Sequence, residues 1–516
     1  MFRKVLVANR GEIALRVMRT CRELGIETIA IYSPVDASSH HRFYADEAHE
    51  VPSEDPLRSY LDIEAIVGVA QEAEAEAIHP GYGFLSENPA FVRACDEAGI
   101  VFVGPPAAAM EVTGDKLRSK AVLREAGVPL SPGSDSPLES PEEAEEAAEA
   151  VGYPVLLKVA GGGGGIGMEL VREAMDLAPA LERAQSLALS AFDVSDIFLE
   201  RYHRHARHIE FQILSDGKRT IHLGERECSI QRRYQKLVEE APSPVVDAEL
   251  RDEIGALSTR AAEALGYANA GTIEYIYSGG NFYFNEVNAR LQVEHPVTEW
   301  LTGLDLVAEQ LALAAGDPLS LEQEDVVLRG WALECRINAE NPYRSFLPSP
   351  GRVTHLGLPS GPGVRVDTAL QVGTEVTTAY DPLVAKIIAY GRDRQQTTRR
   401  MSRALGETLI QGITTNIPFH EAVLRDEAFQ AGQLSIRFIQ ERRIIQALEG
   451  ARMKEERERR TLVAALAAAA VASEGTIPRR MEAFPIRPRS PKAWTRAGRE
   501  EQHRGRNHDV AVRRGL

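Results

Sequence analysis

Polar side chains occupy every second position of one nine-residue segment, and apolar residues fill the positions between them. The polar members are Glu286, Asn288, Arg290, Gln292 and Glu294. A β-strand repeats every two residues, so the pattern predicts one strand with all five on the same face. Two acids, one base and two amides are too costly to bury without partners. We therefore expect this face to line a cleft that binds something charged; a solvated edge strand is the alternative.

A predicted hairpin brings another acid towards this face. Gly271–Tyr277 has the composition of a strand and ends at the turn signal Ser278-Gly279-Gly280-Asn281. A three-residue loop would place Glu274 directly opposite Glu286, whereas a four-residue loop would place Asn285 there. Cross-strand neighbours lie about 5 Å apart, and like charges at that distance repel. A divalent cation between the two carboxylates would turn this repulsion into binding.

The same face offers a third oxygen ligand in Asn288. Carboxylates and an amide oxygen, with no His or Cys in the segment, suit Mg²⁺ or Mn²⁺. The sequence therefore predicts a metal site formed by Glu274, Glu286 and Asn288.

Further cations are concentrated in a second segment, Glu227–Lys236. Arg232, Arg233 and Lys236 lie within five residues, which favours an anion-binding site over an exposed basic turn. Cys228 is interpreted as a packed thiol, because the sequence indicates no partnering base. Arg336 lies in a strand-like apolar setting from which it could reach a cleft, or form an ordinary salt bridge.

The elements that position these residues begin with a β-α-β unit. Lys4–Ala8 is a predicted strand, a helix follows to about Leu24, and Glu27–Tyr32 is the next strand. This order predicts an open parallel sheet. Further along, the strand Val155–Lys158 runs into Gly161–Gly165, which is either a phosphate cradle or a flexible linker.

We predict a multidomain chain of α/β and α+β class. The predicted boundaries are 1–114, 115–325, 326–447 and 448–516. In the last segment a charged and then Ala-rich helix is expected over Met453–Ser473. Beyond Pro478 the chain holds eleven Lys and Arg against four Asp and Glu. We expect that tail to be flexible or to order against a partner.

Composition excludes some classes of protein. The 516 residues are 44% hydrophobic and 26% charged, as in ordinary enzymes, and the net charge of −16 argues against a general nucleic-acid binder. Four widely separated cysteines favour a reducing, cytoplasmic location. No apolar stretch approaches the roughly 20 residues of a membrane helix.

Four motifs resemble those of biotin carboxylase, a ligase of the ATP-grasp superfamily. They are Asn9-Arg10-Gly11-Glu12-Ile13-Ala14, His79-Pro80-Gly81-Tyr82-Gly83-Phe84-Leu85-Ser86-Glu87-Asn88, the run from Glu286 to Glu299, and Tyr380-Asp381-Pro382. The resemblance covers residues 1 to about 445. It implies a Rossmann-like N-terminal domain, an ATP-grasp central domain with a mobile lid at about 131–203, and an α+β C-terminal domain.

The resemblance implies ATP-dependent carboxylation of biotin by bicarbonate. In the family, bicarbonate attacks the γ-phosphate of ATP, and the resulting carboxyphosphate breaks down to CO₂ and phosphate. Phosphate is thought to remove the N1′ proton of biotin, and the enolate so formed attacks CO₂. The implied cofactors are ATP, bicarbonate and two Mg²⁺ or Mn²⁺ ions.

Site residues carry over by the same resemblance. The implied nucleotide contacts are Lys116, Lys158, Gly163, Gly164 and Gly165 at the phosphates, Glu200, His203 and Ile276 at adenine, and His208 and Gln231 at the ribose. The implied catalytic residues are the base Glu294, the bicarbonate anchors Arg290, Gln292, Val293 and Lys236, and Arg336, which stabilises the biotin enolate. The implied metal ligands are again Glu274, Glu286 and Asn288.

The sequence departs from the family pattern at three positions. Ile166 stands where the glycine loop usually carries Lys or Arg, Tyr234 where many members have His, and Trp331 where a His is common. With Trp331 at this position the sequence resembles acyl-CoA carboxylases of the propionyl-CoA type. Which acyl-CoA is carboxylated stays open.

No Met-Lys-Met-like tripeptide in a β-rich module follows residue 450. We therefore expect biotin to be attached to a separate carrier protein, and a separate carboxyltransferase subunit to complete an acyl-CoA carboxylase. The family commonly dimerises, so a homodimer or a larger complex is expected, without nucleic acid or membrane. Two alternatives remain: another carboxyphosphate-forming ATP-grasp ligase, and a non-catalytic ATP-binding scaffold.

Overall fold

A computed structural model describes residues 1–161, 167–192 and 196–473. The chain divides into two units, Met1–Gly450 and Ala451–Leu516. Gly163, Gly164, Gly165 and Ile166 lie outside the described residues, so the predicted phosphate cradle is not placed.

The N-terminal sheet is open and entirely parallel, as the β-α-β pattern predicts. Its strand order is β3-β2-β1-β4-β5. The strands are β1 (Lys4–Val7), β2 (Glu27–Tyr32), β3 (Glu47–Glu50), β4 (Ala77–His79) and β5 (Val101–Phe102). The helices of this part are α1 (Gly11–Glu23), α2 (His40–Tyr44), α3 (Pro56–Ser59), α4 (Ile63–Glu72), α5 (Pro89–Glu97) and α6 (Ala107–Gly114).

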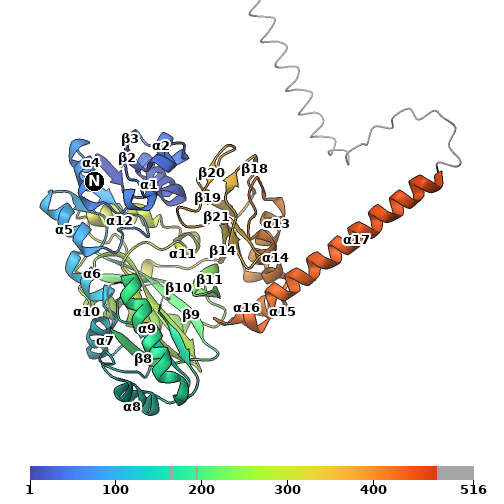
Figure 1. Cartoon of the computed structure of the whole chain (residues 1–516). Helices are drawn as coiled ribbons and strands as arrows, with labels where there is room; N and C mark the ends of the chain where they lie inside the picture. Colours follow the sequence, from blue (N-terminus) through green and yellow to red (C-terminus); the bar gives the residue numbers. More distant parts are fainter. Residues whose placement is uncertain (162–166, 193–195, 474–516) are drawn as a thin grey trace, which may run out of the picture. The chain divides into compact units, whose positions relative to one another are not determined.

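A small antiparallel sheet has its own apolar core within the predicted lid. It consists of β6 (Val155–Val159), β7 (Glu169–Val171) and β8 (Ile197–Arg201), in the order β7-β6-β8. The helices α8 (Pro141–Val151) and α9 (Leu177–Phe192, green in Figure 1) contribute small buried side chains such as Ala144 and Ala184 to that core. As the sequence predicts, α8 begins with Ser140 as N-cap, whose Oγ accepts from the Glu143 amide at 3.2 Å.

The largest sheet has eight strands in the order β13-β12-β9-β10-β11-β14-β21-β19. Five of them precede residue 325: β9 (Arg207–Ser215), β10 (Thr220–Arg232), β11 (Gln235–Ala241), β12 (Asn269–Ser278) and β13 (Asn281–Asn288). Three follow it: β14 (Trp331–Asn338), β19 (Val364–Thr368) and β21 (Leu383–Gly391). Since β11 pairs with β14, the predicted boundary at 325 falls inside one continuous sheet.

Both faces of β14 are used. Leu333, Cys335 and Ile337 alternate along the strand and pack into an apolar core with residues of the C-terminal helices. Glu334 and Arg336 therefore lie on the opposite face, towards the segment before α11 (His295–Thr302).

Other helices complete the first unit. They are α7 (Lys116–Glu125), α10 (Ala248–Ala264), α11 (His295–Thr302), α12 (Leu306–Ala314), α13 (Arg394–Glu407), α14 (Ile417–Arg425), α15 (Glu427–Gln430) and α16 (Phe438–Glu441). Short strands form three two-stranded sheets: β15 (Glu340–Asn341) with β16 (Leu347–Pro348), β17 (Gly351–Arg352) with β20 (Glu375–Val376), and β18 (His355–Gly357) with β22 (Leu409–Gln411).

The predicted helix over Met453–Ser473 is present as the later part of α17 (Ile444–Ser473), which begins in the first unit. Across the described part of the chain, every helix is too short or too polar to span a membrane.

Candidate active site

The β12–β13 hairpin places Glu274 directly opposite Glu286, as predicted, but by a different route. Its loop holds two residues, Gly279 and Gly280, whose φ angles are +60° and +85°. The three-residue loop is therefore wrong. Asn285 is an extra residue that forms a bulge in β13, and this bulge restores the pairing of the two acids.

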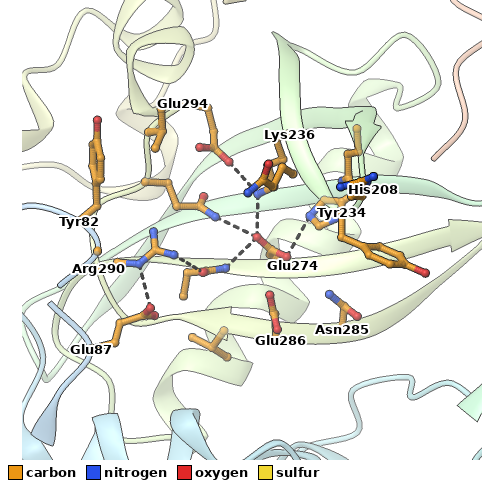
Figure 2. Close-up of a pocket in the computed structure, with 18 of the residues that line it drawn as sticks. Tyr82, Glu87, His208, Tyr234, Lys236, Glu274, Asn285, Glu286, Arg290 and Glu294 are labelled. Atoms are coloured by element: carbon orange, nitrogen blue, oxygen red, sulfur yellow. Dashed lines mark hydrogen bonds and ion pairs between the residues drawn. The ribbon is translucent and has the colours of Figure 1, made fainter. Parts of the chain in front are cut away.

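The predicted strand through Glu294 is wrong in its second half, because β13 ends at Asn288. Glu87 supplies a physical reason: its carboxylate accepts from the backbone amide of Ala289 at 3.0 Å and from Arg290 Nε at 2.9 Å. These bonds replace strand pairing and direct the chain into α11. Gln292 and Glu294 nevertheless face the same polar cluster as Glu274 (Figure 2).

Lys236 is the centre of this cluster. Its Nζ lies 2.5 Å from Glu210 Oε2, 2.8 Å from Glu274 Oε1 and 2.7 Å from Glu294 Oε1. Burial alone would lower the pKa of Lys236, but the three carboxylates outweigh burial and raise it well above its usual range. Lys236 is therefore a permanent cation, and Figure 2 shows its contacts with Glu274 and Glu294.

Glu294 bridges two cations. Its second oxygen, Oε2, accepts from a terminal nitrogen of Arg336 at 2.8 Å. Burial favours the protonated acid, yet Lys236 and then Arg336 hold the pKa of Glu294 below its usual range. The side chain is 2% exposed, so it is a dry carboxylate, ionised at neutral pH, and fits a general base.

The predicted metal ligands lie together, with donors suited to Mg²⁺. Burial and the facing charge of Glu274 raise the pKa of Glu286, and Lys116 Nζ lies 3.8 Å from Glu286 Oε2. Asn288 Nδ2 donates to Glu274 Oε1 at 2.8 Å, so its side chain reaches the same carboxylate. Two facing acids, Glu274 buried and Glu286 partly exposed, together with an amide fit a small divalent cation.

A histidine from another strand also reaches the metal ligands, although the segment that predicted the metal site holds none. His208 Nε2 lies 3.0 Å from Glu274 Oε2, because β9 pairs directly with β12. Burial lowers the pKa of His208, but Glu274 outweighs that effect and the pKa rises to about 9. The imidazolium thus compensates one of the carboxylates.

At the other end of the site, two lysines share one acid. Lys158 Nζ lies 2.6 Å from Glu200 Oε2, and Lys120 Nζ donates to Glu200 Oε1. Burial, and then the neighbouring Lys158, lower the pKa of Lys120 to about 6. Burial and then Lys116 lower the pKa of Lys158 to about 8. Such crowding of cations is suited to a polyanion such as a triphosphate.

One cavity of about 1230 Å³ connects the two ends. The predicted site residues that line it are Lys116, Lys158, Glu200, His203, His208, Gln231, Lys236, Glu274, Ile276, Glu286, Asn288, Arg290, Gln292, Val293, Glu294 and Arg336. His203 stacks on Tyr283 with ring centroids 4.6 Å apart, and its Nε2 lies 3.0 Å from Ser131 Oγ. The stack and the contact with Ser131 hold the His203 ring at the wall of the cavity.

Sequence reasoning missed several residues of the site. Lys120, Glu210 and Glu239 contact the charged side chains of the cavity, and none was singled out. Asn285, which accepts from Lys158 Nζ at 3.1 Å, was considered only as the alternative partner of Glu274 in the hairpin. Glu210 carried a weak signal, since it alternates with His208 on one strand. Glu87 was part of a quoted motif without an assigned role.

An antiparallel sheet bearing facing carboxylates, with lysines from a second small sheet and its neighbouring helix at the same cavity, is the arrangement of an ATP-grasp ligase. Comparison with known families agrees. The biotin carboxylase N-terminal domain matches residues 1–110, the ATP-binding domain of the carbamoyl-phosphate synthase L chain matches 115–322, and the biotin carboxylase C-terminal domain matches 334–441.

Curated relatives are similar over nearly their whole length. A pyruvate carboxylase subunit of Methanothermobacter thermautotrophicus is 51% identical over 460 residues, which cover 89% of this chain and 94% of the relative. Biotin carboxylase 1 of Bacillus subtilis is 48% identical over 443 residues, covering 85% and 98%. The chain belongs to the biotin carboxylase family.

Solved structures share the fold. The biotin carboxylase domain dimer of Hydrogenobacter thermophilus 2-oxoglutarate carboxylase, in complex with MgADP, ADP and bicarbonate, is 48% identical with a TM-score of 0.84, covering 86% of this chain and 98% of that one. A Campylobacter jejuni biotin carboxylase in complex with β-γ-ATP is 41% identical with a TM-score of 0.84, covering 86% and 99%.

Proposed function

We propose that this chain carboxylates biotin with bicarbonate at the expense of MgATP. The observation that carries the proposal is Glu294, a buried carboxylate held ionised between Lys236 and Arg336. It lies in the same cavity as the lysines that suit a triphosphate. Relatives of known structure bind MgADP and bicarbonate, which supports both halves of this assignment.

At the nucleotide end, Lys116 and Lys158 would bind phosphate oxygens. ATP would displace Glu200 as the partner of Lys158, because a triphosphate carries more charge than one carboxylate. Glu274, Glu286 and Asn288 would hold Mg²⁺ or Mn²⁺, which screens the phosphates and orients them for in-line attack.

At the bicarbonate end, Glu294 would take the proton as a bicarbonate oxygen attacks the γ-phosphorus and ADP leaves. Arg290, Gln292 and Lys236 would hold the anion. Lys386 donates to the carbonyl of Val293 at 2.9 Å, which fixes the backbone beside the base. This positioning is where most of the rate enhancement should arise.

Carboxyphosphate then breaks into CO₂ and phosphate, and phosphate takes the N1′ proton of biotin. The biotin enolate attacks CO₂ and forms carboxybiotin. Arg336 would stabilise the enolate oxygen from the edge of the cavity, because its guanidinium is already fixed by Glu239 at 2.6 Å and Glu294 at 2.8 Å.

The direct test is ADP release by the purified chain with Mg²⁺, ATP and bicarbonate, with and without free biotin. We expect turnover that requires bicarbonate and rises with biotin. Turnover independent of biotin would favour another carboxyphosphate-forming ligase. ATP binding without turnover would favour the scaffold, unless the Ile166→Lys variant or an added biotinylated carrier restores activity.

The partners we propose are a separate biotin carboxyl carrier protein and a carboxyltransferase subunit, with this chain as a dimer in a cytoplasmic complex. Two classes of final acceptor stay open. With Trp331 the sequence resembles acyl-CoA carboxylases, which favours an acyl-CoA. The relatives named pyruvate carboxylase and 2-oxoglutarate carboxylase favour a 2-oxo acid instead. The two classes are separated by measuring the carboxylation of acyl-CoAs and of 2-oxo acids by the complex purified from the source of this chain.

The basic tail is proposed to dock one of these partners. Removing residues 451–516 is expected to leave biotin-stimulated ADP release within about twofold, because every described residue of the site lies in the first unit. Assembly with the carrier and carboxyltransferase should weaken, as size-exclusion chromatography would show. Unchanged assembly of the truncated chain would refute the docking role.

A further inference from the structure

Two buried glutamates lie behind Arg336, and of their contacts only the bond from Arg336 to Glu239 enters the proposed chemistry. Glu239 on β11 and Glu334 on β14 are directly opposite each other in the antiparallel pairing. Their side chains are on the same face of the sheet, where cross-strand neighbours approach to about 5 Å. Each residue has essentially no exposed surface. Two carboxylates so placed cannot both be ionised without a large electrostatic cost.

The hydrogen bonds of the two glutamates leave three of their four carboxyl oxygens without a donor in the described part of the chain. Glu239 uses Oε1 to accept from Arg336 Nε at 2.6 Å. Its Oε2 and both carboxyl oxygens of Glu334 are buried without a hydrogen-bond partner among the described residues. A buried acceptor without a donor is costly. One proton on Glu334 would supply that donor, and the buried Oε2 of Glu239 would be its acceptor.

We propose that Glu239 and Glu334 share a single proton, and that this proton sets the negative charge behind Arg336. The pair then carries one charge instead of two. Arg336 consequently keeps more of its positive potential for the side that faces Glu294 and the cavity. This second part rests on the proposed role of Arg336 in stabilising the biotin enolate, while the shared proton does not.

Electrostatics support the shared proton. Burial raises the pKa of Glu334 well above its usual range, and Glu239 raises it further, against the opposing effects of Lys386 and Arg336. Burial likewise raises the pKa of Glu239, although Arg336 opposes it. The charged and titratable groups around the pair come from the packed elements. They are Arg336 and Cys335 on β14, Lys236 on β11, Cys228 on β10, Lys386 on β21, Glu294 before α11, Glu12 on α1 and Tyr82 after β4.

The proton has a defined effect on stability. A carboxyl group whose pKa is raised on folding binds a proton that the unfolded chain has released above pH of about 4.3. The free energy of unfolding therefore falls as the pH rises from that value towards the native pKa. Glutamine at position 334 donates a hydrogen without titrating, so it removes this slope.

The test is infrared spectroscopy of the whole chain at pH 8, where ordinary carboxyl groups are ionised. The difference spectrum between the wild type and Glu334→Gln should show the loss of one protonated-carboxyl C=O band. Glu225 supplies the matched control: it is equally buried, but Arg251 pairs with it at 2.6 Å. Glu225→Gln should remove a carboxylate band instead. Glu334→Leu is the second variant if the glutamine protein does not fold.

Activity tests the second part. The wild type should lose biotin-stimulated turnover at alkaline pH as the shared proton leaves, and Glu334→Gln should lose that alkaline decline, whereas Glu225→Gln keeps it. If the difference spectrum between the wild type and Glu334→Gln lacks the protonated-carboxyl band, the shared proton is refuted, even in a chain without turnover. If the band is present but the pH profiles of turnover are identical in the two proteins, the control of Arg336 by this proton is refuted.

Discussion

Replacing Glu294 with glutamine should lower turnover by about 10²–10⁴-fold, the usual contribution of a general base. The amide keeps the shape of the side chain, but it cannot accept the bicarbonate proton. Because the nucleotide end of the cavity is untouched, the Kd for MgATP should stay within about threefold. Single-turnover ADP formation and nucleotide titration measure the two quantities separately.

Glu309→Gln is the control for this substitution, since Glu309 lies on α12 outside the cavity lining. It should turn over like the wild type. Normal turnover by Glu294→Gln would show that another group takes the proton. Loss of ATP binding in that variant would instead mean that Glu294 organises the nucleotide site.

Replacing Lys236 with methionine should abolish turnover and also destabilise the fold by more than Glu294→Gln does, because both cations that contact Glu294 keep another carboxylate. Methionine leaves Glu210, Glu274 and Glu294 as buried carboxylates without their shared cation. Breaking a buried ion pair by removing one partner costs about 3–5 kcal/mol. Urea unfolding followed by circular dichroism should show this loss without added nucleotide.

The double variant Lys236→Met/Glu210→Gln separates the two effects. It removes one of the three carboxylates that lose Lys236. Glu210 also pairs with Arg226 at 2.6 Å, so only a part of the lost stability should return, while turnover stays absent. If Lys236→Met is as stable as the wild type, the cluster is hydrated or protonated and the cation is not its centre. Recovery of turnover in the double variant would exclude Lys236 from catalysis.

Local pattern was enough to predict the parallel N-terminal sheet, the start of α8 and the pairing of Glu274 with Glu286. The loop of the hairpin was not predictable in this way. A bulge at Asn285 shifts the register by one residue, and this shift offsets a loop shorter than the predicted one. Period-two alternation does not report how many residues a bulge adds.

The end of β13 shows a second limit. Alternation continues to Glu294 in the sequence, yet the strand ends at Asn288. The backbone amide of the next residue, Ala289, bonds to Glu87, some two hundred positions earlier in the chain, and not to a neighbouring strand. The convergence of Glu210, Glu294 and Lys236 is equally non-local. The family resemblance could name residues that lie in the cavity, whereas their ion pairs required three-dimensional contacts.

The pairing of β11 with β14 has a consequence for dividing this protein. Cutting the chain at residue 325 for separate expression would expose two long strand edges at the middle of an eight-stranded sheet. Such edges present rows of unpaired amides and carbonyls, which are templates for aggregation. Fragments or chimaeras should therefore exchange the piece with its own three-stranded sheet, from β6 to β8, and keep the eight strands together.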